Sequence, residues 1–278
     1  MSFIADIIGS AAGLAAAGKR PIVELMFSDF VVVTLDPIMN HIAKNHYMSG
    51  GSVNMPVVIT TAVGGGYGDA AQHSQTLYAL FGHIPGLKVV VPSNSYDAKG
   101  LMISAIKDNN PVVYMFHKGL LGLPWMPYPQ STVTEVPEEE YTIPIGKANI
   151  VRKGNDVTIV GIGSTVHMAL EAAEKLEEGK ISAEVIDLRS VKPLDTDTVI
   201  NSVSKTGSLI VADEDYRAFG LTSEIISTVS QKLFGKIKTA PASVSSPDIP
   251  VPYSQRMEKY SLPDTKKIID AVKEMLRR

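Results

Sequence analysis

The chain has 278 residues, of which 45% are hydrophobic and 20% are charged, and this composition excludes disordered, collagenous and coiled-coil proteins. A formal net charge of −3 without long basic runs argues against nucleic-acid binding, and the lack of cysteine excludes disulfides and thiolate metal sites. The length favours two domains, and nothing in the composition demands an oxidising compartment, so we expect a cytoplasmic protein.

The N-terminal segment is apolar, but its basic residues Lys19 and Arg20 follow the apolar stretch instead of preceding it, unlike those of a signal peptide. The stretch is also too short to span a bilayer, so we expect no membrane association. Small residues recur at every fourth position and share one face of a helix. They are Ala5, Gly9, Gly13 and Ala17. We expect a buried helix at an interface.

Hydrophobic periodicity in the first half predicts strands alternating with helices, which is typical of a parallel sheet covered by helices. The predicted helices span residues 4–17, 29–46, 74–82 and 95–108. The predicted strands span residues 21–26, 56–60, 87–91 and 111–116. This half holds five of the six histidines but few charged residues, so its ionisable groups lie among apolar neighbours.

Residues 119–149 are rich in proline and acidic side chains, which predicts an interdomain connection with the boundary near residue 140. The strands predicted beyond it span residues 156–163, 182–189 and 208–214. The predicted helices span residues 164–179, 195–204 and 221–234, with a last one after Pro263. We therefore expect two three-layer α/β domains, residues 1–140 and 141–278.

Two short motifs have both a functional and a structural interpretation. The glycines of residues 64–68 could approach a phosphate, but they lack the dinucleotide and P-loop spacings, so a flexible loop is the simpler interpretation. His73 lies among polar residues where a loop enters a helix, so it could transfer a proton in a cleft or only stabilise the helix turn.

Longer motifs occur in a recognisable order along the whole chain. They are PIVELMFSDF (21–30), YMSGG (47–51), AAQHSQ (70–75), PGLKVVVPSNSYDAKGLMISAIKDNNPVV (85–113) and RSVKPLD (189–195). With these motifs the chain resembles the β subunit of thiamine-diphosphate-dependent 2-oxo acid dehydrogenases. EEEYTIPIGKA and HKGLLG are most similar to the acetoin-cleaving branch, ahead of the pyruvate-type and branched-chain-type subunits.

The resemblance implies a transketolase-like pyrimidine-binding domain followed by a transketolase C-terminal domain. It also implies an α2β2 heterotetramer with an α subunit that holds diphosphate and magnesium, and acyl transfer to a lipoyl-bearing acyltransferase core. By the resemblance, Phe30 packs beside the aminopyrimidine and His73 faces the substrate and lipoyl channel, although Phe30 could also be a core residue. It further implies a potassium loop, bound mostly through backbone carbonyls, at Val57, Ala105, Ile106, Asp108 and Asn110.

The chain departs from the family pattern at two places. Ile4 stands where the family has the glutamate that activates the cofactor, and isoleucine cannot exchange a proton. Asp6 would point elsewhere on a helix. Thr60 and Ala62 replace an Arg-x-Pro approach to the glycines.

These departures leave alternatives open. The chain either lacks the family's N-terminal region, which we favour, or is a variant that no longer activates the cofactor. Two other functions also stay open: half of a split transketolase or deoxyxylulose-phosphate synthase, and an inert assembly subunit.

Overall fold

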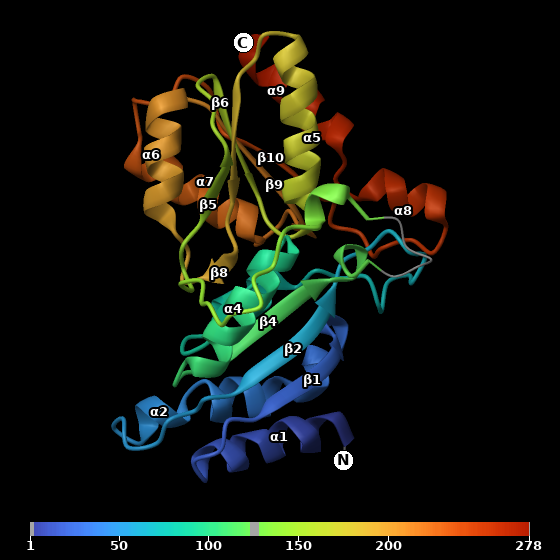
Figure 1. Ribbon diagram of the computed structural model, residues 1–278. Coiled ribbons are helices and arrows are strands. Elements are labelled where there is room, and N and C mark those ends of the chain that lie inside the picture. Colours follow the sequence, from blue (N-terminus) through green and yellow to red (C-terminus); the bar gives the residue numbers. More distant parts are fainter. Residues whose placement is uncertain (1–2, 123–127, 278) are drawn as a thin grey trace.

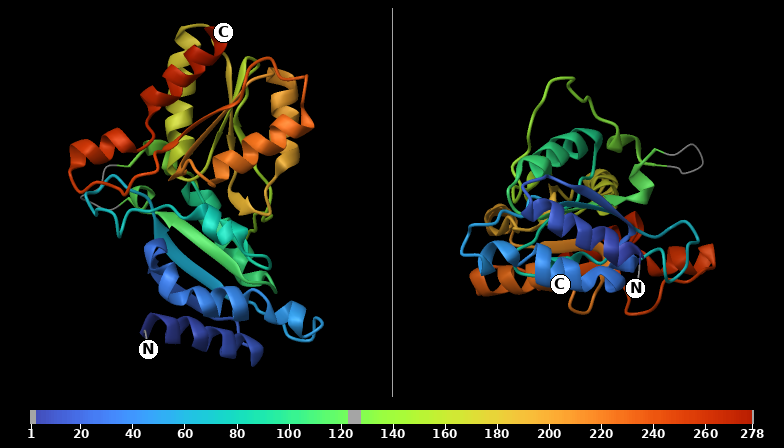
Figure 2. Two further views of the ribbon diagram at one scale, coloured as in Figure 1. Left: turned by 180° about the vertical axis from the view of Figure 1, so that it is seen from behind. Right: turned by 90° about the horizontal axis from the view of Figure 1, so that it is seen from below.

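The computed structural model describes residues 3–122 and 128–277, so part of the predicted connection 119–149 lies outside the described residues. Two five-stranded sheets, each packed against helices, form two α/β units (Figure 1). The N-terminus lies at the far end of one unit and the C-terminus at the far end of the other (Figure 2). The predicted α/β fold class is confirmed.

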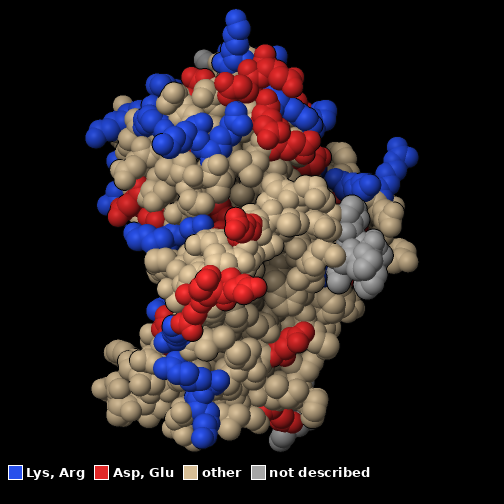
Figure 3. Space-filling model, in the orientation of Figure 1, with Lys and Arg blue, Asp and Glu red and all other residues tan. Residues whose placement is uncertain are grey.

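The first sheet has the strand order β1-β2-β4-β3-β8, with β1, β2, β4 and β3 parallel. Its own elements are α1 (Phe3–Ala16), β1 (Ile22–Phe27), β2 (Val58–Val63), α3 (Tyr78–His83), β3 (Lys88–Val90), α4 (Ser95–Lys107) and β4 (Val112–His117). Charged side chains are sparser over this unit than over the second one (Figure 3). The uneven distribution of charged residues along the sequence thus corresponds to a difference between the surfaces of the two units.

The second sheet has the order β10-β9-β6-β7-β5, in which only β5 is antiparallel to its neighbour. Its strands are β5 (Asn149–Arg152), β6 (Val157–Gly161), β7 (Ala183–Asp187), β9 (Leu209–Tyr216) and β10 (Ala242–Ser246). Its helices are α5 (Ser164–Glu178), α6 (Thr196–Thr206), α7 (Leu221–Lys232), α8 (Gln255–Ser261) and α9 (Thr265–Arg277). Sequence periodicity missed β5, β10 and α8.

A short strand joins the two units. β8 (Ser190–Lys192) directly follows the second-sheet strand β7, yet it pairs antiparallel with β3, placing Lys192 opposite Val89. Ile143 also packs against Leu101 of α4 in the first unit, although it lies beyond the predicted boundary. The boundary near residue 140 therefore stays a prediction.

The prediction of one helix over residues 29–46 was wrong. A 3-10 helix η1 (Ser28–Thr34), a π-helix η2 (Pro37–Ile42) and a short α2 (Asn45–Met48) follow one another instead. Pro37 has no N–H for a regular helix, and the β-branched residues 31–34 favour it weakly. The predicted helix at residues 74–82 begins only at Tyr78, and the Gln75 amide ahead of it donates a hydrogen bond to the Asp29 carboxylate.

Helix α1 confirms the predicted helix at residues 4–17, but its small-residue stripe is only partly buried, with Ala5 and Gly9 half-buried and Ala17 exposed. Ile8 and Ala11 are buried, whereas Gly13 is exposed and a side chain there would meet no atom within 4 Å. The role of this stripe at an interface stays a prediction. Within the described part of the chain, every helix is too short or too polar to cross a membrane.

Candidate active site

Three aromatic rings meet beyond the carboxyl end of β1. The His73 ring centroid lies 5.2 Å from that of Phe27 and 5.6 Å from that of Phe30, and both pairs are edge-to-face. Phe27 and Phe30 are 6.1 Å apart. All three side chains are half-buried, so the cluster borders the surface. The structure thus brings together the two predicted site residues Phe30 and His73.

A buried lysine holds the loop that carries His73. Lys118 Nζ donates to Asp69 Oδ2 and to the His73 carbonyl, at 2.6 Å each. It also lies 5.3 Å from the centre of the Phe27 ring and 5.6 Å from that of Tyr67. Only 8% of the Lys118 side chain is exposed, so carboxylate, carbonyl and ring faces replace its hydration. Lys118, which directly follows the buried strand β4, was not predicted as a site residue from the sequence.

Asp29 adds an acceptor beside Phe30. Its Oδ1 accepts hydrogen bonds from the backbone and side-chain nitrogens of Gln75, at 3.3 and 2.9 Å. Its Oδ2 is buried and has no hydrogen-bond partner among the described residues. A buried carboxylate oxygen without a donor is costly, so this atom is suited to an incoming N–H group.

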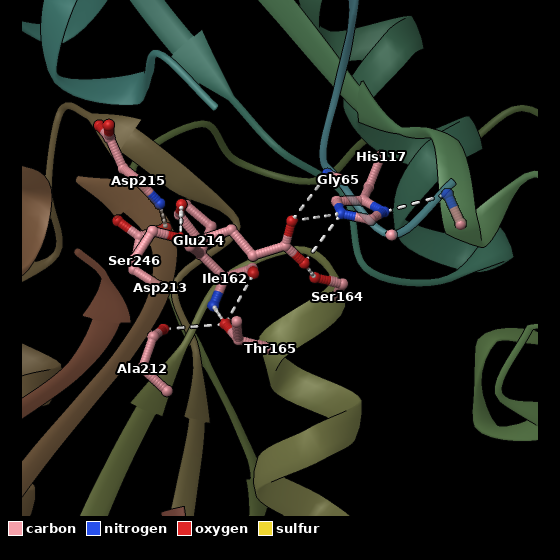
Figure 4. A network of polar contacts seen from close by, with 12 residues as sticks. Gly65, His117, Ile162, Ser164, Thr165, Ala212, Asp213, Glu214, Asp215 and Ser246 are labelled. Carbon is pink, nitrogen blue, oxygen red and sulfur yellow. Dashed lines mark hydrogen bonds and ion pairs between the residues drawn. The ribbon is translucent and has the colours of Figure 1, made fainter. Parts of the chain in front are cut away.

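A second polar network joins the two units (Figure 4). His117, at the end of β4, places Nε2 3.0 Å from both carboxylate oxygens of Glu214 in β9. The Gly119 N–H donates to His117 Nδ1, so Nε2 carries the proton that faces Glu214. Burial opposes ionisation of Glu214, but His117 and hydrogen bonds from Ser164 and Gly65 outweigh it and lower the pKa of this carboxyl.

The glycine-rich loop after β2 is already bound by carboxylates. Gly65 N donates to Glu214 Oε2 at 3.3 Å, whereas Gly66 N and Gly68 N donate to Glu258 Oε1 and Oε2 at 2.8 and 2.9 Å. These are the amides that a phosphate would use. Their occupation favours the structural interpretation of residues 64–68.

The loop predicted to bind potassium contacts a guanidinium group. Arg20 Nη1 donates to the carbonyls of Ile106 and Asp108, at 3.0 and 2.9 Å. Two further loop positions have internal partners: Ala105 O accepts from Asp108 N at 3.3 Å, and the Val57 carbonyl accepts from the amide of Val112 at 2.9 Å.

The last predicted ligand of that loop, Asn110, donates from both nitrogens to Asp108 Oδ1 at 2.9 Å. Lys88 also bonds the Asp108 carboxylate. Carbonyls suited to a cation are therefore gathered here, and the Arg20 guanidinium already contacts two of them.

Ile4 lies in the first turn of α1 and is half-buried. It packs against the same hydrophobic core as Phe30. The start of α1 lies near the carboxyl end of β1, because helix and strand run in opposite directions (Figure 1). Ile4 is therefore on the side of the first unit where the aromatic cluster lies, as an apolar residue.

Comparison with known proteins identifies both units. Residues 5–124 match the transketolase pyrimidine-binding domain, and residues 146–268 match the transketolase C-terminal domain. The β subunit of acetoin:2,6-dichlorophenolindophenol oxidoreductase from Cupriavidus necator is 48% identical over 270 residues, which cover 97% of this chain and 77% of that relative. The chain belongs to the family of acetoin and 2-oxo acid dehydrogenase β subunits.

Other members and more distant proteins agree with this assignment. The β subunit of the pyruvate dehydrogenase E1 component from Rickettsia felis is 43% identical over 96% of this chain and 79% of its own length. A split-gene transketolase, solved as an inactive β4 tetramer, has a TM-score of 0.78 at 25% identity, covering 99% of this chain and 82% of that one. The aromatic cluster of this β subunit lies within the matched pyrimidine-binding domain.

Proposed function

We propose that this chain is the β subunit of a thiamine-diphosphate-dependent acetoin or 2-oxo acid dehydrogenase, in which the aromatic cluster forms the aminopyrimidine side of the cofactor site. The cluster of Phe27, Phe30 and His73 carries the proposal, because it joins rings and a proton-transfer group at one edge of a pyrimidine-binding domain.

The residues of the cluster fit such a cofactor. Phe30 offers a half-buried ring for a heteroaromatic group, and the buried Asp29 Oδ2 offers an acceptor beside it. When bound, thiamine diphosphate supplies the nucleophilic carbon and the electron sink for carbon–carbon cleavage. The glycine-loop amides are filled, and no group of three metal-ligating side chains occurs among residues 3–122 and 128–277. We therefore assign diphosphate and magnesium to the α subunit.

His73 is the proton-transfer group of this proposal. Its imidazole has one ring nitrogen that can donate a proton and one that can accept it, and the Phe27 and Phe30 rings limit its orientations. Lys118 fixes the backbone at His73, so the imidazole stays at the rim of the site. Phe30 would pack against the cofactor ring.

Acetoin is our first choice of substrate, before pyruvate and branched-chain 2-oxo acids. An acetoin oxidoreductase β subunit is 48% identical to this chain, whereas a pyruvate dehydrogenase β subunit is 43% identical. We further propose an α2β2 heterotetramer in the cytoplasm that passes an acyl group to a lipoyl-bearing acyltransferase core. The cation of the loop at residues 105–110 would be potassium where the Arg20 guanidinium leaves room.

The test is turnover by the chain purified with its α subunit, with acetoin, pyruvate and 2-oxoisovalerate offered in turn. We expect activity that requires thiamine diphosphate, and a loss of about 100-fold for His73→Ala. Phe30→Ala should weaken cofactor binding, measured by calorimetry. His83→Ala, an exposed histidine of α3, is the control. Turnover independent of thiamine diphosphate would refute the proposal.

An inert assembly subunit is the second candidate, and the apolar Ile4 favours it. A silent wild-type complex that gains turnover through Ile4→Glu would support this candidate, whereas an active wild type excludes it. Transfer of a two-carbon unit to a sugar phosphate, measured in the same preparation, tests the split-transketolase alternative.

A further inference from the structure

We propose that Glu258 is a positioning residue for His73: it binds the glycine-rich loop from the second unit and thereby sets the position of the loop that carries the imidazole. The inference rests on the proposed function only for the role of His73. The mechanical part concerns residues 64–75 and can be measured without activity.

The contact between Glu258 and the loop spans the two units. Glu258 belongs to α8, is fully buried, and lies 192 residues from Gly66 along the chain. Each carboxylate oxygen accepts one backbone N–H, from Gly66 at 2.8 Å and from Gly68 at 2.9 Å. Figure 1 shows α8 projecting from the second unit towards the loops of the first. A bidentate, charge-assisted pair of this kind fixes the direction of both amides.

The glycines make this binding possible. Gly66 and Gly68 have φ values of +102° and +74°, in a region that other residues rarely adopt. Their amides converge on one carboxylate because the backbone is in this conformation. Without an acceptor, both N–H groups would have to find other partners, and the conformation would lose its main support.

A displacement of the backbone at Gly68 would reach His73, because only a few residues separate them. Asp69 follows Gly68 directly, and its carboxylate accepts a hydrogen bond from the Lys118 ammonium. The same ammonium donates a hydrogen bond to the His73 carbonyl. Ala70, between them, has φ +58°, a strained conformation that surrounding contacts must maintain. The segment is therefore held at its start by Glu258 and at its end by Lys118.

Asp195 provides a matched control, because its carboxylate binds backbone amides in another part of the protein. It is also buried and accepts two backbone amides, from Ala148 at 3.0 Å and Thr198 at 3.2 Å. Both amides belong to the second unit, away from the glycine-rich loop. Asp195→Asn therefore imposes a comparable structural loss without loosening the His73 loop.

The experiment compares Glu258→Gln, Glu258→Asp and Asp195→Asn in the complex with the α subunit. In Glu258→Gln an NH2 group replaces one acceptor and faces an amide N–H. We expect hydrogen–deuterium exchange of peptides covering residues 64–77 to accelerate at least about tenfold, and kcat to fall about 10- to 100-fold while KM for the substrate changes less than about twofold. Glu258→Asp should recover part of both losses. Asp195→Asn should change neither.

Unchanged exchange in both Glu258 variants, or faster exchange with wild-type kcat, overturns the positioning role. If Glu258→Gln does not fold, the same two readouts on Glu258→Asp decide it. Wild-type turnover by His73→Ala would instead defeat the proposed role of His73, whatever Glu258 does to the exchange of the loop.

Discussion

The His117 imidazole lies 3.0 Å from both carboxylate oxygens of Glu214, although the two residues come from different sheets. Their side chains are only 4% and 5% exposed. Neither group can be solvated if its partner is lost, so loss of either one would weaken the contact between the two units.

Replacement of Glu214 by alanine should lower the free energy of unfolding by about 3 to 5 kcal/mol, because it leaves His117 buried without its partner. Chemical denaturation at pH 7 measures this change. Glu178→Ala, at the exposed end of α5, should cost less than about 0.5 kcal/mol. Equal losses in the two variants would show that the pair contributes nothing specific.

The pH dependence of the same pair has a definite sign. The folded state lowers the pKa of Glu214 below 4.5, so its stabilisation is present above that value and is lost as the pH falls through the lower folded pKa. Between pH 5 and pH 3 the wild type should therefore lose more stability than Glu214→Gln. Parallel losses would contradict the prediction.

Asp187 should have the opposite effect. Burial and the nearby Asp97 raise its pKa to about 7, against hydrogen bonds from Ser93 and Arg189. The contribution of Asp187 to the free energy of unfolding is thus greatest below pH 3.8. As the pH rises further, this contribution declines by about 1.4 kcal/mol per pH unit until the folded pKa is passed. The stability of Asp187→Asn relative to wild type should rise from pH 4 to pH 7, as measured by urea unfolding. A constant difference would exclude an ionisable Asp187 as the cause.

Lys118→Met removes the ammonium from beneath the His73 loop and keeps the volume of the side chain. We expect kcat of the complex with the α subunit to fall about 10- to 100-fold, with partial recovery in Lys118→Arg. Lys99→Met is a close control, because Lys99 Nζ binds the carbonyls of Glu138 and Glu139, at 3.0 Å each, far from His73 in the fold. A similar decline in the control would argue against a local effect.

Arg20→Ala should expose the carbonyls of Ile106 and Asp108 and so uncover a cation site. The variant should lose about 1 kcal/mol of stability, and potassium chloride should restore more of it than lithium chloride. Thermal unfolding in both salts measures the response, with Arg152→Ala as the control, since Arg152 pairs with Glu177 on the surface. If both salts act alike on Arg20→Ala, the loop does not select potassium.

Hydrophobic periodicity predicted most of the helices and strands, and the elements that it missed were missed for physical reasons. Strands such as β6 and helices such as α5 bury long apolar patterns, so local sequence determines them. β8 has three residues, too few to show any period, and its pairing with β3 depends on tertiary contacts. α8 follows a proline-rich stretch that indicates no helix.

The candidate site was predictable only in part. Phe30 and His73 were found through family motifs, and the structure then placed their rings in contact. Lys118, Glu214 and Glu258 were not found. Glu214 lies 97 residues from its partner His117, and no local pattern links residues so distant in sequence.

The strand exchange through β8 constrains how this molecule can be divided. A gene cut near residue 140 would give a first fragment whose sheet ends at β3, because the strand that covers that edge is encoded downstream. Fission of the gene, or a protease nick in the connection, would therefore yield pieces that recombine in trans more readily than they fold alone. By the same reasoning, calorimetry should record a single melting transition instead of one per half.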